Sequence, residues 1–481
     1  MKTWSQYENS KKKNIFATTI FILVGAITIR YFFVEKAEKF NILLLSTCSL
    51  RADRLGFNGK VPSSTPSIDK VANSSFIFEN AYTDMSWSNV SGFLNKITSE
   101  TVDQLGYKAI GKPWTKAELN WQLVTSTEAA PYYFRLPNAK DFARAEPSNY
   151  AEDLLALKKR LLDRSKWPFF IEAHNKTMHF PYGLGFGSEE VPAIRDKISE
   201  KSRAYLHEYV MNIRKYPERI PLGFFFLKKK EIIREVVHIL KFNKAQAAEL
   251  RKSRRSLSFV GILNNQNMLD RWSKSKYFKR DLEVIKEIYD KRLEIYDESI
   301  NEMVNLYHDE ELQKNTVIIF AGDHGEAFFE HGHMIHGNTV YDEMIRFPMF
   351  VKFPGQKRAV KIKKQFYQNS IYDIIMKIMS GDLNQNNFEE FMEKHGETPL
   401  IFSRNCANDI RSLRYKNEWK LIYDYKNDKK QLFNLVSDPS ESRDVSDQNP
   451  DIMAFLLEKI DEVAKEQLSN KMIHTCTKEN E

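Results

Sequence analysis

Cysteine is scarce in this chain, and the three residues present form no pattern. Cys48, Cys406 and Cys476 are widely spaced in 481 residues, and their number is odd. A disulfide scaffold needs paired cysteines, so a small disulfide-stapled fold is excluded. Hydrophobic residues make up 42% of the chain, which at this length is enough to bury a large core in one or two domains.

Excess charge of either sign is also small. The formal net charge of +8 permits attraction to anionic lipid or polysaccharide without demonstrating it. Basic residues concentrate between Lys201 and Arg255. Three interpretations fit this region: a solvated helical face, an insertion that binds an anionic membrane surface or polymer, or a nucleic-acid surface. No nucleic-acid-binding module accompanies the charge, so we expect no nucleic-acid partner.

Long apolar runs are absent except at the amino terminus. Asn14 to Val34 is almost entirely apolar up to Arg30 and follows Lys11 to Lys13. About 20 helical residues cross a bilayer core, so the sequence predicts a single transmembrane anchor at 14–34 after a cytoplasmic tail at 1–13. A cleaved signal peptide is the alternative, but no clear small-x-small cleavage site follows the run. The rest of the chain is then expected to be periplasmic or extracellular.

Three short apolar segments have the composition of buried strands: Phe40 to Leu45, Lys166 to His174 and Thr316 to Phe320. Polar residues follow two of them directly, Cys48-Ser49 after the first and Asp323-His324 after the last. Ligand sites in open α/β sheets gather at the carboxyl edge of the strands. Adjacent Asp and His at such an edge indicate a metal or phosphate site, although a polar loop with surface histidines gives the same pattern.

The chain resembles the sulfatase branch of the alkaline phosphatase superfamily from about Phe40 to Leu468. The resemblance rests on motifs in the family's order, which here read Leu50-Arg51-Ala52-Asp53-Arg54-Leu55-Gly56, Thr65-Pro66-Ser67-Ile68-Asp69, Phe78-Glu79-Asn80-Ala81-Tyr82, Asp323-His324-Gly325-Glu326, Glu330-His331-Gly332, Gln431-Leu432-Phe433-Asn434-Leu435 and Asp438-Pro439-Ser440-Glu441. It implies an α/β fold, a mixed sheet flanked by helices, in a catalytic domain at 39–355. A small carboxyl-terminal α+β subdomain at 356–475, with an antiparallel sheet and a closing helix, would follow.

The resemblance also implies a metal site that departs from the family pattern. Asp323 and His324 match two family ligands, but the family's other metal-binding pair falls on Cys48 and Ser49. Ca²⁺ and Mg²⁺ prefer carboxylate oxygen, whereas a cysteine ligand suits Zn²⁺. We therefore expect a divalent cation and leave its identity open among Ca²⁺, Mg²⁺ and Zn²⁺.

The nucleophile position of the family falls on Ser88, in a motif that has lost its usual proline and its Arg or His, at Val90 and Gly92. Conversion of Ser88 to formylglycine is not expected, so any nucleophile is a plain hydroxyl that a metal or base must activate. The alternative is that Ser88 only caps a helix. The resemblance implies substrate contacts for His179 and His336, with His331 less favoured.

Two functions remain open. The first is a membrane-anchored hydrolase or transferase that acts through a metal-activated serine on sulfate or phosphate esters of a glycan or lipid. The second is a catalytically impaired protein that keeps the fold as a module for binding anionic ligands, polysaccharide or lipid. The second function is supported by the replacement of the family's residues at Cys48, Ser49 and Gly92. The first is supported by the family's residues that remain, Asp323, His324 and His336.

Overall fold

The computed structural model describes residues 39–86, 108–109, 132–135, 162, 167–175, 178–180, 182, 194, 197–223, 265–306, 309–405 and 409–468. Within those ranges, no helix combines the length and the hydrophobicity that a membrane crossing requires. The anchor predicted at 14–34 lies outside them.

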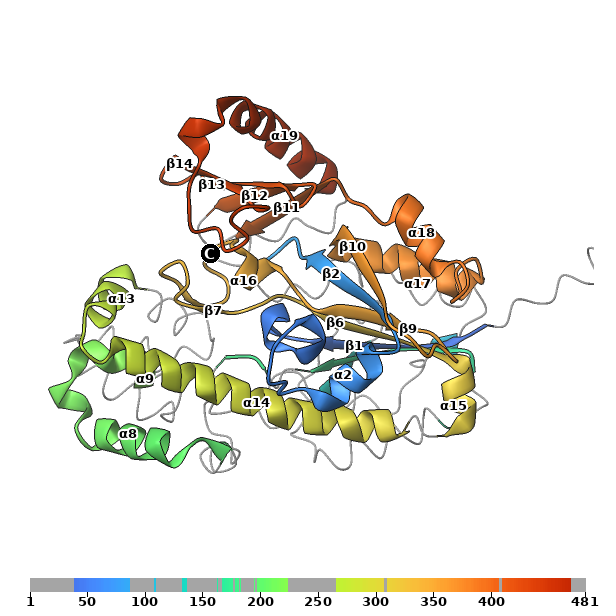
Figure 1. The fold of residues 1–481 in the computed structure, drawn as a ribbon, viewed down its shortest axis with the longest axis horizontal. Helices are drawn as coiled ribbons and strands as arrows, with labels where there is room; N and C mark the ends of the chain where they lie inside the picture. The colour runs from blue at the N-terminus through green and yellow to red at the C-terminus, as the bar shows by residue number, and fades with distance from the viewer. Residues whose placement is uncertain are drawn as a thin grey trace, which may run out of the picture.

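A mixed eight-stranded sheet forms the centre of the molecule (Figure 1). Its order is β10-β2-β9-β6-β1-β5-β3, and β4 pairs with β5 at the side. β6, β1, β5 and β3 run parallel, as do β10 and β2, whereas β9 and β4 are antiparallel to their neighbours. The strands are β1 (Asn41–Thr47), β2 (Phe76–Tyr82), β3 (Lys108–Ala109), β4 (Tyr132–Arg135), β5 (Phe169–Asn175), β6 (Thr316–Gly322), β9 (Met349–Lys352) and β10 (Val360–Tyr367).

Alternating side chains of the central strands build two core layers, one on each face of the sheet. In β1, Leu43 and Leu45 join one layer while Ile42 and Leu44 join the other, because successive side chains of a strand point to opposite faces. Helices cover both faces (Figure 1). The first layer includes α2 (Pro66–Ala72), α8 (Glu200–Met211), α9 (Ile220–Gly223), α13 (Gln266–Ser273), α14 (Phe278–Leu306) and α15 (Glu310–Asn315), and the second includes α17 (Ile371–Ser380) and α18 (Phe388–His395).

A four-stranded antiparallel sheet forms the carboxyl-terminal subdomain. It contains β11 (Leu400–Asn405), β12 (Ile410–Tyr415), β13 (Trp419–Asp424) and β14 (Lys429–Asn434) in that order. Leu421 packs with α19 (Pro450–Leu468), whereas the next residue, Ile422, packs against the main domain beside α16 (Asp342–Ile345). The subdomain is therefore fixed to the main domain through one face of its sheet.

The structure confirms the predicted mixed α/β fold with a carboxyl-terminal sheet. The strands expected at 40–45, 166–174 and 316–320 are β1, β5 and β6, and the closing helix is α19. The boundaries at 39–355 and 356–475 stay predictions.

Candidate active site

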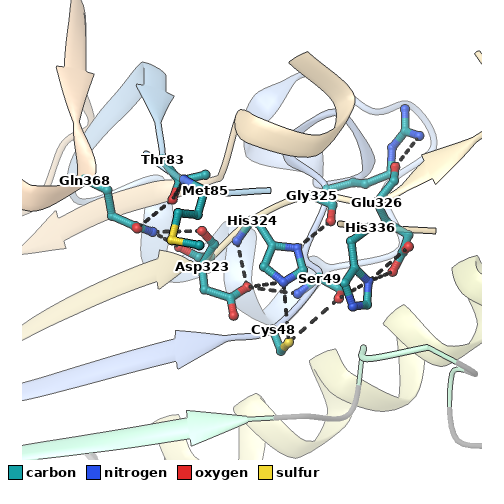
Figure 2. A network of polar contacts seen from close by, with 12 residues as sticks. Cys48, Ser49, Thr83, Met85, Asp323, His324, Gly325, Glu326, His336 and Gln368 are labelled. Atoms are coloured by element: carbon teal, nitrogen blue, oxygen red, sulfur yellow. Dashed lines mark hydrogen bonds and ion pairs between the residues drawn. The ribbon is translucent and has the colours of Figure 1, made fainter. Parts of the chain in front are cut away.

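The carboxyl ends of β1 and β6 bring Cys48 and Ser49 beside Asp323 and His324 (Figure 2). β1 and β6 are parallel neighbours in which Thr47 pairs with Gly322, so the residues that follow each strand emerge at the same edge. The Asp323 amide continues the pairing by donating to the Thr47 carbonyl at 2.9 Å. Residues 275 positions apart in sequence thus meet at one point.

Three potential ligand atoms converge there. The Cys48 Sγ, one Asp323 carboxylate oxygen and one His324 ring nitrogen all lie within 4.8 Å of one another. All three side chains are buried, with exposed fractions of 0%, 6% and 0%. In the part of the chain that the structure describes, these three side chains are the one group of His, Cys, Asp or Glu whose ligand atoms lie close enough to hold a metal ion.

Backbone hydrogen bonds fix the orientation of Asp323. Its Oδ1 accepts from the amide of Ser49 at 3.0 Å and from the amide of His324 at 2.7 Å. Its Oδ2 is buried and has no hydrogen-bond partner among the described residues. A buried carboxylate oxygen without a partner is costly, and a bound cation would satisfy it. The donor set therefore fits a divalent metal ion.

The tautomer of His324 follows from its hydrogen bond to a backbone carbonyl. Its Nδ1 lies 2.8 Å from the Gly325 carbonyl oxygen, which can only accept, so Nδ1 carries the hydrogen. The lone pair of the neutral ring is then on Nε2, which lies 3.8 Å from the Cys48 Sγ and 3.6 Å from the Asp323 Oδ1. Burial lowers the pKa of His324, which favours this neutral, metal-binding form.

Ser49 makes the turn that holds the cluster together. Its φ of 55° is left-handed, a conformation that costs a non-glycine residue about 1 kcal/mol or more and persists only where the surroundings enforce it. The Tyr289 hydroxyl of α14 donates to the Ser49 carbonyl at 2.9 Å and accepts from the Arg51 amide at 3.0 Å. The Ser49 Oγ then lies 3.2 Å from the His336 Nδ1.

His336 and Glu326 form a buried pair beside this turn. The His336 Nδ1 is 3.0 Å from the Glu326 Oε2, and the two side chains are 6% and 0% exposed. Burial lowers the pKa of His336 to about 4 and raises the pKa of Glu326 well above its ordinary value. Burial therefore disfavours the charged form of both side chains.

His179 follows β5, the other parallel neighbour of β1. Its ring centroid lies 4.9 Å from that of His336, and its Nδ1 donates to the Phe180 carbonyl at 2.6 Å. His336 also lies 4.7 Å from the His324 ring centroid. The three histidines therefore form a continuous row along the edge of the sheet.

His331 lies apart from this row. It bonds Glu343 at 2.8 Å and stacks on Tyr341 at 3.7 Å between ring centroids. Its Nε2 is hydrogen-bonded to the carbonyls of Ser440 and Glu441, so it connects the main domain to the carboxyl-terminal subdomain. Asp53, which the resemblance places outside the metal pair, makes an ion pair with Arg51 at 2.8 Å.

Some sequence predictions fall outside the described residues. The predicted nucleophile Ser88 lies outside them, as do Val90 and Gly92 of the same motif. Most of the basic region beyond residue 223 also lies outside them.

Sequence reasoning noted Glu326 as part of a motif but gave it no role. A Glu three residues after the strand-end Asp is the signal that was available, because a carboxyl group so close to a buried strand must find a partner.

Nothing in the sequence indicated Gln368, which follows β10. Its Nε2 donates to the Asp323 carbonyl at 2.9 Å and its Oε1 accepts from Thr83 at 2.8 Å (Figure 2).

Comparison with known proteins identifies the family. The model of the sulfatase family matches residues 99–381, more than half of the chain. The chain belongs to the sulfatase family. The matched region contains Asp323, His324 and His336 but begins after Ser88, so the departures at Cys48, Ser49, Val90 and Gly92 lie in the part that the family model does not cover.

The individual relatives of this chain are distant. Arylsulfatase K of Homo sapiens is 24% identical over 222 residues, which cover 42% of this chain and 41% of that protein. The chain thus matches about two fifths of the length of its curated relatives. A solved 2-O GAG sulfatase superposes with a TM-score of 0.54 at 12% identity, over 89% of this chain and 93% of the other. A protein solved with its substrate D-glucosamine-2-N,6-O-disulfate gives a TM-score of 0.52 at 16% identity, over 91% and 100%. These structural likenesses establish the fold.

Proposed function

We propose that this protein hydrolyses sulfate esters at the edge of the sheet where β1 and β6 end. The observation that carries the proposal is the convergence of Cys48, Asp323 and His324 within 4.8 Å in a chain of the sulfatase family. The buried His336–Glu326 pair lies beside this cluster. The site therefore joins a cation-binding group to a group that can move a proton.

A divalent cation held by Cys48, Asp323 and His324, with Ser49 alongside, would polarise the ester and lower the pKa of an attacking hydroxyl. Ser88 is the nucleophile in this proposal, on the strength of its position in the family motif. Its hydroxyl oxygen would attack sulfur in line with the ester oxygen that leaves, and the hydroxyl proton would pass to water. A water molecule would then cleave the sulfated serine, releasing sulfate and restoring the Ser88 hydroxyl. An unmodified serine is a weak nucleophile at its own pKa, which is why the proposal couples it to a cation.

His336 would supply the proton to the leaving oxygen. When the Glu326 carboxyl donates to Nδ1, the neutral imidazole carries its own hydrogen on Nε2. As Nε2–H passes its proton to the leaving oxygen, the Glu326 proton can move to Nδ1, which keeps the imidazole neutral and leaves one negative charge on the Glu326 carboxylate. Glu326 is thus a positioning residue, and His179, in contact with the His336 ring, would hydrogen-bond the anionic oxygens.

The substrate class in this proposal is a sulfated saccharide. Two proteins of the same fold support it by their names, the 2-O GAG sulfatase and the protein bound to D-glucosamine-2-N,6-O-disulfate. The predicted anchor at 14–34 would hold the sulfatase on a bilayer, with the catalytic domain on the periplasmic or extracellular side. Phosphate esters and lipid substrates are the alternatives within the same chemistry.

The test compares hydrolysis of an aryl sulfate, D-glucosamine-2-N,6-O-disulfate and an aryl phosphate by the full-length protein and by Asp323→Ala. We expect sulfate release from a sulfate ester to fall about 10²–10³-fold in the variant, the loss typical of one preorganised electrostatic contact. Asp373→Ala removes an exposed carboxylate from the first turn of α17 and should keep the wild-type rate.

Equal rates in the wild type and Asp323→Ala would refute the proposal. So would a folded, metal-loaded wild type that binds a sulfated saccharide without releasing sulfate, which is the behaviour of a binding module. Faster release of phosphate than of sulfate would instead assign the site to phosphate esters.

A further inference from the structure

The donor atoms at the candidate metal centre differ in chemical softness from those that suit Ca²⁺ or Mg²⁺. Cys48 contributes a sulfur, His324 a nitrogen and Asp323 an oxygen. Hard cations prefer oxygen ligands, six to eight of them for Ca²⁺, whereas Zn²⁺ accepts sulfur, nitrogen and oxygen in one small shell. The described residues around this point offer few oxygens, because Glu326 is engaged by His336 and the Asp323 Oδ1 by two amides.

The distances between the donor atoms also suit a small tetrahedral cation. Zinc bond lengths of about 2.3 Å to sulfur and about 2.0–2.1 Å to nitrogen and oxygen place neighbouring ligand atoms about 3.3–3.6 Å apart. The His324 Nε2 lies 3.8 Å from the Cys48 Sγ and 3.6 Å from the Asp323 Oδ1. These two distances exceed the zinc values by a few tenths of an ångström, and Asp323 also presents its unpartnered Oδ2.

We infer that Cys48, Asp323 and His324 form a centre selective for Zn²⁺ over Ca²⁺ and Mg²⁺. This inference rests on the proposed function, since it names the cation of the same site. Three protein ligands leave a fourth position, which is the arrangement of catalytic rather than structural zinc. The Ser49 Oγ, 3.7 Å from the Cys48 Sγ, borders that position.

The experiment strips the full-length protein with a chelator and titrates it with Co²⁺, Zn²⁺, Ca²⁺ and Mg²⁺. Two readouts are independent of activity: the thermal unfolding midpoint, and the near-ultraviolet charge-transfer band that a thiolate gives when it binds Co²⁺. We expect one Co²⁺ per chain with a thiolate band, displacement of Co²⁺ by one equivalent of Zn²⁺, and no displacement by a large excess of Ca²⁺ or Mg²⁺.

Variants at Cys48 test the source of the selectivity. Cys48→Asp and Cys48→Ser should both abolish the thiolate band, and Cys48→Asp should lower the ratio of Zn²⁺ to Ca²⁺ affinity at least about tenfold, because a carboxylate replaces the soft ligand. Cys406→Ala removes a thiol elsewhere in the sequence and should leave the band intact. Circular dichroism checks that each variant folds. If Cys48→Asp does not fold, Cys48→Ser, whose side chain is closest in size to cysteine, still tests whether the thiolate band comes from Cys48.

Ca²⁺ binding in preference to Zn²⁺, or a thiolate band that persists in Cys48→Ser, would overturn the inference. The failures of the two proposals are distinguishable. Sulfate release supported by Ca²⁺ would leave the proposed function standing and refute zinc selectivity. Zinc bound through Cys48 without any ester hydrolysis would refute the proposed function and leave zinc selectivity standing.

Discussion

At the scale of single residues, burial decides the chemistry of the site. His336 and Glu326 have ionisable side chains, yet both are almost fully buried and 3.0 Å apart. Burial disfavours the charged form of each: it lowers the pKa of His336 to about 4 and raises the pKa of Glu326 well above its ordinary value. When such a pair passes a proton toward a leaving group, the negative charge that remains rests on the buried Glu326 carboxylate.

The lowered pKa of His336 predicts a pH dependence of stability. The native state keeps His336 neutral down to about pH 4, whereas the unfolded chain takes up this proton near pH 6.5. Between these values the unfolded state carries a proton on His336 that the native state lacks, so acidification through this window should lower the unfolding free energy of the metal-free wild type relative to His336→Gln. The contribution of His336 to the unfolding free energy is fully present above pH 6.5, is lost as the pH falls to 4, and amounts to up to about 3 kcal/mol.

Urea unfolding of the wild type and His336→Gln from pH 4 to pH 7 measures this contribution, because glutamine does not titrate. The unfolding free energy of the wild type should fall relative to that of His336→Gln as the pH is lowered from 6.5 to 4. His395→Gln, at an exposed histidine at the end of α18, should match the wild type. A pH-independent difference for His336→Gln would contradict the assigned pKa.

At the scale of elements, helix α14 determines the shape of the turn after β1. The Tyr289 hydroxyl bridges the Ser49 carbonyl and the Arg51 amide, and so supports the left-handed residue whose amide orients Asp323. Gly325, three residues after the end of β6, contributes similarly, because a Cβ there would lie 2.0 Å from the Glu343 carbonyl oxygen. The site is therefore positioned by backbone contacts that bind no ligand themselves.

Tyr289→Phe should weaken the site from a distance. It leaves a buried amide and a buried carbonyl without their partner, which costs about 1–3 kcal/mol of stability. Loss of such a supporting contact typically lowers metal affinity about 10–100-fold. Thermal unfolding and metal titration measure the two effects. Tyr423→Phe, whose hydroxyl bonds Asp428 at the surface, is the control. Unchanged metal affinity in Tyr289→Phe would show that α14 does not support the turn.

At the scale of the whole molecule, buried charges join the carboxyl-terminal sheet to the main domain. The Lys420 ammonium of β13 is fully buried and lies 2.8 Å from Asp342 of α16 and 2.6 Å from Glu441. Arg414 of β12 pairs with the same Asp342 at 2.9 Å. These contacts set the subdomain against the segment that follows the site.

Lys420→Met should destabilise the protein strongly, since it removes the cation that pairs with Glu441 and leaves Asp342 with Arg414 alone. Removing one partner of a buried ion pair costs about 3–5 kcal/mol, whereas a surface pair is worth about 0–1 kcal/mol. Lys430→Met, whose partner Asp428 is exposed, should therefore change the unfolding free energy little. Similar losses in the two variants, measured by urea unfolding, would argue against a structural role for the buried network.

The sequence predicted the parts of this fold that depend on local patterns. β1, β5 and β6 are short apolar runs, and the motif after β6 placed Asp323 and His324 at a strand end. Local patterns do not report contacts between distant segments. The partnership of Glu326 with His336, the left-handed turn at Ser49 and the support from Tyr289 depend on how three strands and a helix meet, so the structure was needed to find them.

The most direct test of a working metal-dependent centre is the metal content of the full-length protein purified without chelator, beside Asp323→Ala. About one divalent cation per chain in the wild type, lost in a folded Asp323→Ala, is the predicted result. A wild-type protein that is folded yet holds no cation, even after incubation with Zn²⁺, Ca²⁺ or Mg²⁺, would contradict the account and leave a sulfatase fold without its metal chemistry.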